Sequence, residues 1–174
     1  DPAVKETAAS QGVDVLDRPA ALSGDSATAA QVIAHALDSS VTEDLLVYLQ
    51  PTSPLRRTCD INAALELLST SEAEAVVSVT EVTEHPEWMY RMSANDYRLE
   101  ALVSHLRSSP RQDLPRTVRL NGAIYSSSAA TLRPDGNFFR LCLYGYEMPS
   151  DRSIDIDTPE DLELARSLLS KWSL

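Results

Sequence analysis

Two aspartates, Asp155 and Asp157, are separated by one isoleucine in the segment Ser153–Asp157. Side chains alternate along a strand, so both carboxylates would lie on one face, about 6–7 Å apart. Mg²⁺ usually takes one or two carboxylates and completes its shell with water and substrate phosphates. The pair therefore predicts a divalent-metal site. A second interpretation stays open for Asp157, which would cap a helix beginning at Pro159 with Glu160 as its capping-box partner.

A second polar segment, Gln50–Pro54, follows the apolar run Leu45–Leu49 and leads to Arg56. It offers an amide, two hydroxyls and a guanidinium, and its two prolines lower the entropy cost of ordering the loop. Ligands of open α/β sheets bind beyond the carboxyl ends of the strands, so this loop is a candidate binding site. The alternative is a rigid strand-to-helix turn in which Thr52 and Ser53 serve the turn itself.

A third polar group consists of Arg111, Asn121 and Tyr125. A guanidinium such as that of Arg111 pairs well with a carboxylate through two parallel hydrogen bonds. The amide of Asn121 and the phenol of Tyr125 are suited to hydrogen-bond sugar hydroxyls. From these residue types alone, a surface charge at Arg111 and a turn at Asn121-Gly122 are the simpler interpretation.

The elements that must position these groups alternate between helices and strands. Leu45–Leu49 and Ala75–Val79 are continuous apolar runs, which are typical of strands buried on both faces of a parallel sheet. A helix over Thr58–Leu68 separates them, a short strand is predicted at Val13–Leu16, and a last amphipathic helix follows from Pro159 to Leu169. The order predicts βαβ units, and therefore an α/β domain with a mostly parallel sheet.

Residues 85–115 differ from the rest of the chain. They contain Trp88, Met89, Tyr90 and Tyr97 together with several arginines. We expect a strand pair and a short helix that project from the sheet. Exposed aromatic and methionine side chains there would suit a subunit interface, and a small satellite core under a long loop is the alternative.

The bulk composition excludes several classes of protein. The 174 residues suit one domain, and the formal net charge of −11 leaves no basic footprint for nucleic acid. An anionic small molecule would need local arginines or a metal ion. No apolar run is long enough for a membrane span, and the start of the chain has no secretory signal pattern. Cys59 and Cys142 lack metal-ligand spacing, and free thiols fit a reducing cytoplasm.

Five motifs in order resemble the CMP-N-acylneuraminate synthetases over essentially the whole chain. They are RPAALSGD, LQPTSPLR, RQDLP, NGAIY and SIDIDTPEDLELA. The resemblance implies a Rossmann-like α/β fold, with residues 85–115 as a dimerisation extension and a homodimer as the assembly. It also implies transfer of CMP from CTP to the anomeric hydroxyl of an acidic 2-keto sugar, with release of pyrophosphate and with Mg²⁺ stabilising the developing charge.

The same resemblance implies roles for individual residues. Asp155 and Asp157 would hold the metal and, with Gln50, form the catalytic group. Four side chains would surround the sugar: Gln50, Arg111, Asn121 and Tyr125. Phe138 and Phe139 would pack against its acyl group. The nucleotide would be contacted by Arg18, Ser26 and Thr28.

Family members begin with a strand and a basic, glycine-containing loop that cradles the triphosphate. We expect residues 1–174 to form one cytidylyltransferase-like domain that lacks this segment. The sugar would be N-acetylneuraminate, Kdo, legionaminate or pseudaminate, and the phenylalanine pair favours an N-acyl sugar. A non-catalytic relative that binds an acidic sugar or only dimerises is the competing hypothesis.

Overall fold

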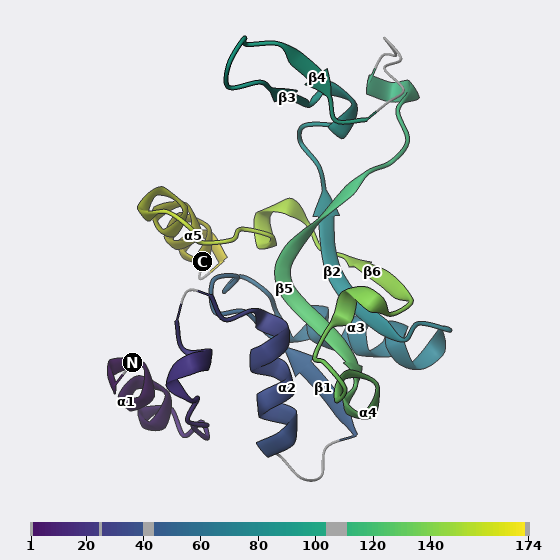
Figure 1. Ribbon diagram of the computed structural model, residues 1–174. Coiled ribbons are helices and arrows are strands. Elements are labelled where there is room, and N and C mark those ends of the chain that lie inside the picture. The colour runs from purple at the N-terminus through teal and green to yellow at the C-terminus, as the bar shows by residue number, and fades with distance from the viewer. Residues whose placement is uncertain (1, 25, 40–43, 104–110, 173–174) are drawn as a thin grey trace.

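The structure is a computed structural model that describes residues 2–24, 26–39, 44–103 and 111–172 (Figure 1). Its α-helices are α1 (Pro2–Ser10), α2 (Ala29–Ser39), α3 (Thr58–Thr70), α4 (Ala129–Leu132) and α5 (Pro159–Trp172). Its strands are β1 (Leu45–Tyr48), β2 (Ala75–Glu81), β3 (Tyr90–Met92), β4 (Leu99–Ala101), β5 (Val118–Ser128) and β6 (Leu143–Glu147). Short 3₁₀ turns are η1 (Ala20–Leu22), η2 (Pro86–Trp88), η3 (Arg111–Asp113), η4 (Phe138–Arg140) and η5 (Ser150–Arg152).

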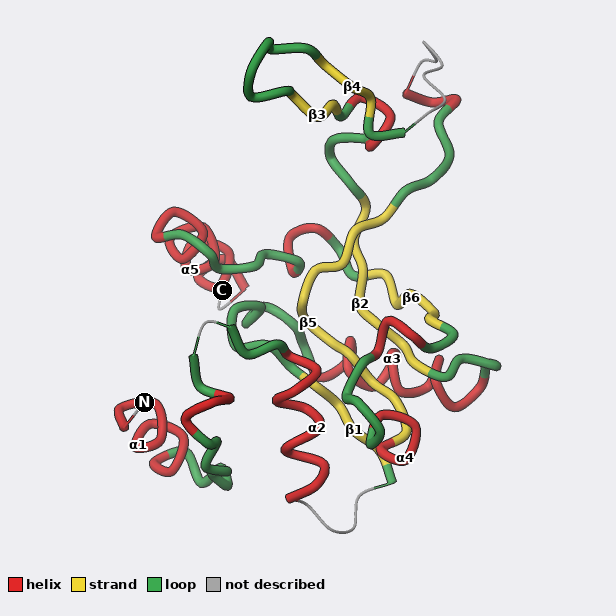
Figure 2. Tube along the Cα trace, in the orientation of Figure 1, coloured by secondary structure: helices red, strands yellow, loops and turns green. Residues whose placement is uncertain are grey.

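The central sheet has the strand order β1-β5-β2-β6. β2 and β6 are parallel, whereas β5 runs antiparallel to both β1 and β2. Three of the four strands therefore share one direction, and the prediction of an α/β fold with a mostly parallel sheet is confirmed. β5 is reversed because the chain leaves the end of β2, passes through the projecting segment and returns alongside the same strand (Figure 2).

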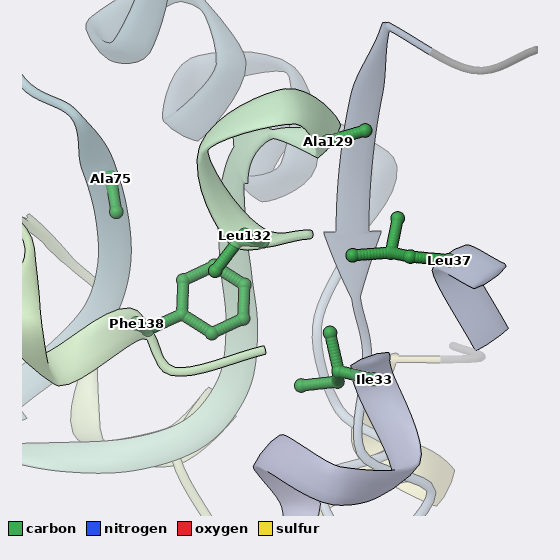
Figure 3. Close-up of a cluster of buried hydrophobic side chains, with 6 residues drawn as sticks. All are labelled: Ile33, Leu37, Ala75, Ala129, Leu132 and Phe138. Atoms are coloured by element: carbon green, nitrogen blue, oxygen red, sulfur yellow. The ribbon is translucent and has the colours of Figure 1, made fainter. Parts of the chain in front are cut away.

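Helices cover both faces of the sheet. One buried cluster joins α2, α4 and η4 to the sheet, and its members are Ile33, Leu37, Ala75, Ala129, Leu132 and Phe138 (Figure 3). The other joins α3 to the opposite face, and its members are Ala64, Val76, Ala123, Ile124 and Met148. The neighbours Ala75 and Val76 thus point to different layers, as the strand period requires. This explains why β2 is apolar on both faces.

β1 is less buried than its sequence predicted. Leu45 is 43% exposed and the rest of the strand is only partly buried. Within the described residues β1 pairs with β5 alone, so the prediction of a strand buried on both faces is wrong here. The strand predicted at Val13–Leu16 is also wrong, because that segment enters no sheet. The next residue, Asp17, contacts α2, because its carbonyl oxygen lies 3.3 Å from the Nε2 atom of His35.

The strand pair predicted within residues 85–115 is present. β3 and β4 form an antiparallel hairpin that projects from the sheet (Figure 1), with Tyr90, Met92 and Leu99 largely exposed. Residues 104–110 and the side chain of Arg111 lie outside the described part of the chain. Dimerisation through this extension stays a prediction. None of the helices in the described ranges combines the length and the apolar character that a membrane span requires.

Candidate active site

An irregularity in β5 creates the centre of the candidate site. Val77 of β2 pairs with Tyr125 and Val79 pairs with Leu120, so residues 121–124 of β5 lie opposite the single residue Ser78. Such bulges interrupt the backbone ladder, and they are common beside active sites. Here Gly122 has a positive φ of 75°, a conformation that favours glycine.

Three polar side chains converge on Gly122. A Cβ atom at this position would lie 2.5 Å from Oε1 of Gln50, 2.9 Å from Oγ of Ser53 and 3.5 Å from Oδ2 of Asp155. The predicted polar loop and one of the two predicted aspartates therefore meet above the backbone of β5. Because only a glycine leaves room for these oxygens, the backbone bulge and the polar cluster form one unit.

The side chain of Arg56 fixes the loop that contains Gln50. One guanidinium nitrogen, Nη1, donates to the carbonyl oxygens of Gln50 at 2.8 Å and of Ser53 at 2.6 Å. The Ser53 hydroxyl is buried and donates to the carbonyl of Asn121 at 3.1 Å. Arg56 and Ser53 therefore hold the turn, as the turn interpretation predicts, whereas a binding role for the Gln50 amide stays a prediction.

The aspartate segment is not a strand of the sheet, and that prediction is wrong. Residues 153–157 join η5 to α5, and the Ile156 amide ties them to the Gln50 loop by donating to the Thr52 carbonyl at 2.8 Å. Asp155 is partly buried and faces the cluster around Gly122, whereas Asp157 is exposed. The segment joins no strand, because it runs along the Gln50 loop toward α5.

The helix cap of α5 does not use Asp157. The Thr158 amide donates to Oδ2 of Asp161 at 2.9 Å, and the Asp161 amide donates to the Thr158 hydroxyl at 3.3 Å. Hydrogen bonds from Thr158 and from the Asp157 amide hold the pKa of Asp161 below its ordinary value. Thr158 and Asp161 form the reciprocal cap. Helix capping therefore gives no role to the Asp157 carboxylate or to Glu160.

Asn121 is buried, with only 1% of its surface exposed. Its Oδ1 accepts hydrogen bonds from the Ser78 hydroxyl at 2.6 Å and from the Ala123 amide at 3.2 Å. Its Nδ2 donates to the Ser153 hydroxyl at 2.9 Å. The side chain thus connects β2 to the aspartate segment, while a sugar contact by Asn121 stays a prediction. Sequence reasoning missed Ser78, although a serine inside the apolar run Ala75–Val79 was a visible signal.

Tyr125 belongs to an aromatic cluster beside the polar cluster. Its ring centroid lies 5.8 Å from that of Tyr48, 5.6 Å from Phe138 and 6.4 Å from Phe139. Burial, Tyr48 and the charge of Asp155 raise the pKa of Tyr125 above its ordinary value. Its phenol therefore keeps its proton, and its donor capacity, at neutral pH.

The two phenylalanines occupy different environments. Phe138 is 3% exposed and packs in the core with Ile33 and Leu132, as Figure 3 shows. Phe139 is 59% exposed and meets the Tyr125 ring edge to face. A small recess lies between this aromatic cluster and the first turn of α2. Of the pair, Phe139 is the one with surface available to a ligand.

The residues predicted to contact the nucleotide lie around α2. Arg18 lines an apolar groove between α2 and β1 together with Val32 and Leu46. Thr28 caps α2, since its hydroxyl accepts from the Gln31 amide and its own amide donates to the Gln31 side chain. Ser26 is exposed. No described contact joins these three residues to the cluster around Gly122, so their roles stay predictions.

The donor set of the aspartate segment fits a hard divalent cation. Asp155 and Asp157 supply carboxylate oxygens, and the described residues contain no larger grouping of His, Cys, Asp or Glu that would hold a metal without further ligands. Mg²⁺ usually takes one or two protein carboxylates and completes its shell with water and substrate phosphates, so these two aspartates would suffice to hold it, and the metal stays a prediction.

Comparison with known proteins tests the motif resemblance. No family model matches the chain. An N-acylneuraminate cytidylyltransferase of Streptococcus agalactiae serotype V is 33% identical over 157 residues, which is 90% of this chain and 38% of the relative. The chain is related to the N-acylneuraminate cytidylyltransferases.

Further relatives agree with this result. The N-acylneuraminate cytidylyltransferase of Escherichia coli O18:K1:H7 is 32% identical over 165 residues, 94% of this chain and 39% of the relative. A CMP-N,N'-diacetyllegionaminic acid synthase of Legionella pneumophila is 28% identical over 132 residues, 72% of this chain and 54% of the relative. The chain thus spans about two fifths of the length of the N-acylneuraminate cytidylyltransferases it matches.

Proposed function

We propose that this chain forms the sugar-binding and metal-binding part of a nucleotidyltransferase that transfers CMP from CTP to a sialic-acid-like sugar and releases pyrophosphate. The observation that carries the proposal is the convergence of Gln50, Ser53 and Asp155 on Gly122 in a relative of the cytidylyltransferases. A polar cluster of this kind beside an aromatic recess suits a ligand with hydroxyl groups and an apolar substituent.

In this proposal the residues of the chain position the reacting groups. Asp155 and Asp157 would hold Mg²⁺, which when bound would neutralise charge on the phosphate oxygens. Gln50 would orient the sugar through its side-chain amide, and Tyr125 would donate from its protonated phenol. Arg111 would pair with the sugar carboxylate. Phosphoryl transfer needs little more than such positioning and electrostatic stabilisation.

The sugar is proposed to be an N-acyl nonulosonate. Phe139 and Tyr125 present an edge-to-face aromatic surface that suits an acetamido methyl group. The relatives include both an N-acylneuraminate enzyme and a diacetyllegionaminate enzyme, so both sugars belong in the test. The proposal includes a homodimer assembled through the β3–β4 extension and a cytoplasmic location, which the free thiols of Cys59 and Cys142 suit.

Pyrophosphate release from CTP tests this function. Because the chain spans 38% of the streptococcal relative, residues 1–174 should replace the matching region of that protein in a chimera. The chimera should release pyrophosphate with Mg²⁺ and N-acetylneuraminate or diacetyllegionaminate, and less with Kdo. A folded chimera that is silent with every sugar, next to an active parent, would contradict the proposal and favour the non-catalytic alternative.

A further inference from the structure

The segment that contains both aspartates is held by hydrogen bonds outside the ladder of the sheet. Residues 153–157 lie between η5 and α5 (Figure 1) and belong to no strand. The Ser153 amide donates to the Ser150 carbonyl at 3.2 Å, and the Ile156 amide donates to the Thr52 carbonyl at 2.8 Å. The Asp157 amide donates to Oδ2 of Asp161 at 3.2 Å. Two carboxylates that hold one metal ion must be placed precisely enough to share it. Side-chain contacts of the residues just before Asp155 would contribute to that placement.

Arg152 supplies the strongest of these contacts. Its Nη2 donates to Oδ1 of Asp60 at 2.6 Å, and its Nε donates to Oδ2 of the same carboxylate at 3.1 Å. The Asp60 side chain is fully buried, and that of Arg152 is 18% exposed. This is a bidentate pair, which fixes direction as well as distance. Arg152 is located one residue before Ser153 and three residues before Asp155.

Asp60 is itself held from two further elements. Its Oδ2 accepts from the Arg57 amide at 2.8 Å, and its Oδ1 accepts from the Tyr146 hydroxyl at 3.0 Å. The carboxylate therefore joins the start of α3, the end of β6 and η5. Burial raises the pKa of Asp60, but the hydrogen bonds from Arg152, Arg57 and Tyr146 outweigh burial and hold its pKa below the ordinary value.

Capping α3 does not explain this arrangement. The cap needs only the bond from the Arg57 amide to the Asp60 carboxylate. A buried ion pair is weak evidence for a role in stability, because apolar residues of similar volume often stabilise a core as well or better. What the bidentate pair adds is a fixed orientation for the residue that leads into the aspartate segment. Asn121 acts next to it by holding Ser153.

We propose that Asp60 and Arg152 are positioning residues for the metal-binding aspartates. The pair fixes the end of η5, so that Asp155 faces Gly122 and Asp157 follows two residues later in the same segment. Neither Asp60 nor Arg152 touches substrate in this assignment. The inference deepens the proposed function and rests on it for the identity of the ligand, a divalent cation held by Asp155 and Asp157.

The test measures metal binding and local order in the 174-residue chain. Mn²⁺ is the probe, because its binding is followed directly by electron paramagnetic resonance. Arg152→Lys keeps the charge but removes the two-point geometry. The double variant Asp60→Asn/Arg152→Met removes both charges together and avoids leaving one buried charge unpaired. Both should weaken Mn²⁺ binding by about 10-fold, the size of effect that residues supporting metal ligands produce.

Hydrogen exchange provides the second readout. Amides of residues 153–157 should exchange faster in both variants, while those of β2 and β5 should not change. Arg166→Met removes an exposed arginine that pairs with Glu163 on α5, and it should leave both readouts at the wild-type level. Leu37→Ala weakens the core away from the segment and controls for lost stability.

The outcomes separate this inference from the proposed function. Wild-type Mn²⁺ affinity and unchanged exchange in both pair variants would overturn the positioning role. If the unmodified chain itself binds no Mn²⁺, the metal assignment of the proposed function fails instead. Hydrogen exchange at residues 153–157 then decides the positioning role alone: faster exchange in folded variants supports it, and unchanged exchange overturns it.

Discussion

Gly122 lies directly against the side-chain amide of Gln50, so that a methyl group on Gly122 would stand 2.5 Å from Gln50 Oε1. The two residues come from segments that are far apart in the sequence. They meet because β1 and β5 pair antiparallel, with Tyr48 opposite Tyr125, so the end of β1 reaches the bulge in β5. The contact makes the backbone of Gly122 part of the candidate site.

Gly122→Ala should therefore be more harmful than backbone strain alone predicts. An alanine with positive φ costs about 1–2 kcal/mol, and the added methyl would also displace the oxygens of Gln50, Ser53 and Asp155. Gly12→Ala is the matched control, because Gly12 also has a positive φ (72°) but nothing lies within 4 Å of its Cβ position. Urea unfolding and sugar binding should show a larger loss for Gly122→Ala. Equal losses would contradict the crowded geometry.

Asp155→Asn and Asp157→Asn test the metal assignment in the chimera described above. Each should lower turnover by about 10²–10³-fold, as expected when an electrostatic contribution to the transition state is lost. Circular dichroism should show the fold unchanged.

Thr158→Ala is the neighbouring control. It removes the cap of α5 and should cost about 1 kcal/mol of stability while turnover is retained. Normal turnover of CTP by both aspartate variants would contradict their assignment as metal ligands. An equally inactive Thr158→Ala would show that disturbing the start of α5, and not loss of a carboxylate, causes the loss of turnover.

Alanine variants at Phe138 and Phe139 should separate an effect on protein stability from an effect on sugar binding. Phe138→Ala opens a cavity in the core and should cost about 3–5 kcal/mol of unfolding free energy. Phe139→Ala removes an exposed ring and should change stability by about 0.5 kcal/mol or less. In the chimera Phe139→Ala should instead raise the KM for an N-acyl sugar by about 10-fold or more. A normal KM for this variant would remove Phe139 from the acyl site.

Much of the fold could be predicted from the sequence because local patterns determine it. The helical spacing of Ile61, Leu65 and Leu68 predicted α3, and the apolar run at Ala75–Val79 predicted β2. The direction of β5 could not be predicted, because it depends on where the projecting segment returns. The exposure of β1 depends likewise on which strand lies beside it, and its own residues do not specify that neighbour.

The site was predictable by residue type but not by arrangement. The Gln50 loop and the Asp155 segment were identified as polar groups near strand ends, and the structure brings them together at Gly122. The burial of Asn121 was not predictable, since it results from a bulge that inserts residues 121–124 opposite Ser78. The link from Asp60 to Arg152 was missed because the two residues are 92 positions apart and neither belongs to a motif.

Acid sensitivity should report the ionised state of Asp60. Its pKa is depressed in the folded chain, so near and below the unfolded value of about 3.9 the unfolded chain binds more protons than the folded one. The stability from Asp60 is therefore present above that pH and is lost as the pH falls through the folded pKa. Unfolding free energy from urea titrations between pH 7 and pH 2.5 should fall less steeply for Asp60→Asn. Leu37→Ala, which is destabilised but keeps Asp60, should retain the wild-type slope, and parallel curves for all three proteins would show that Asp60 does not titrate with unfolding.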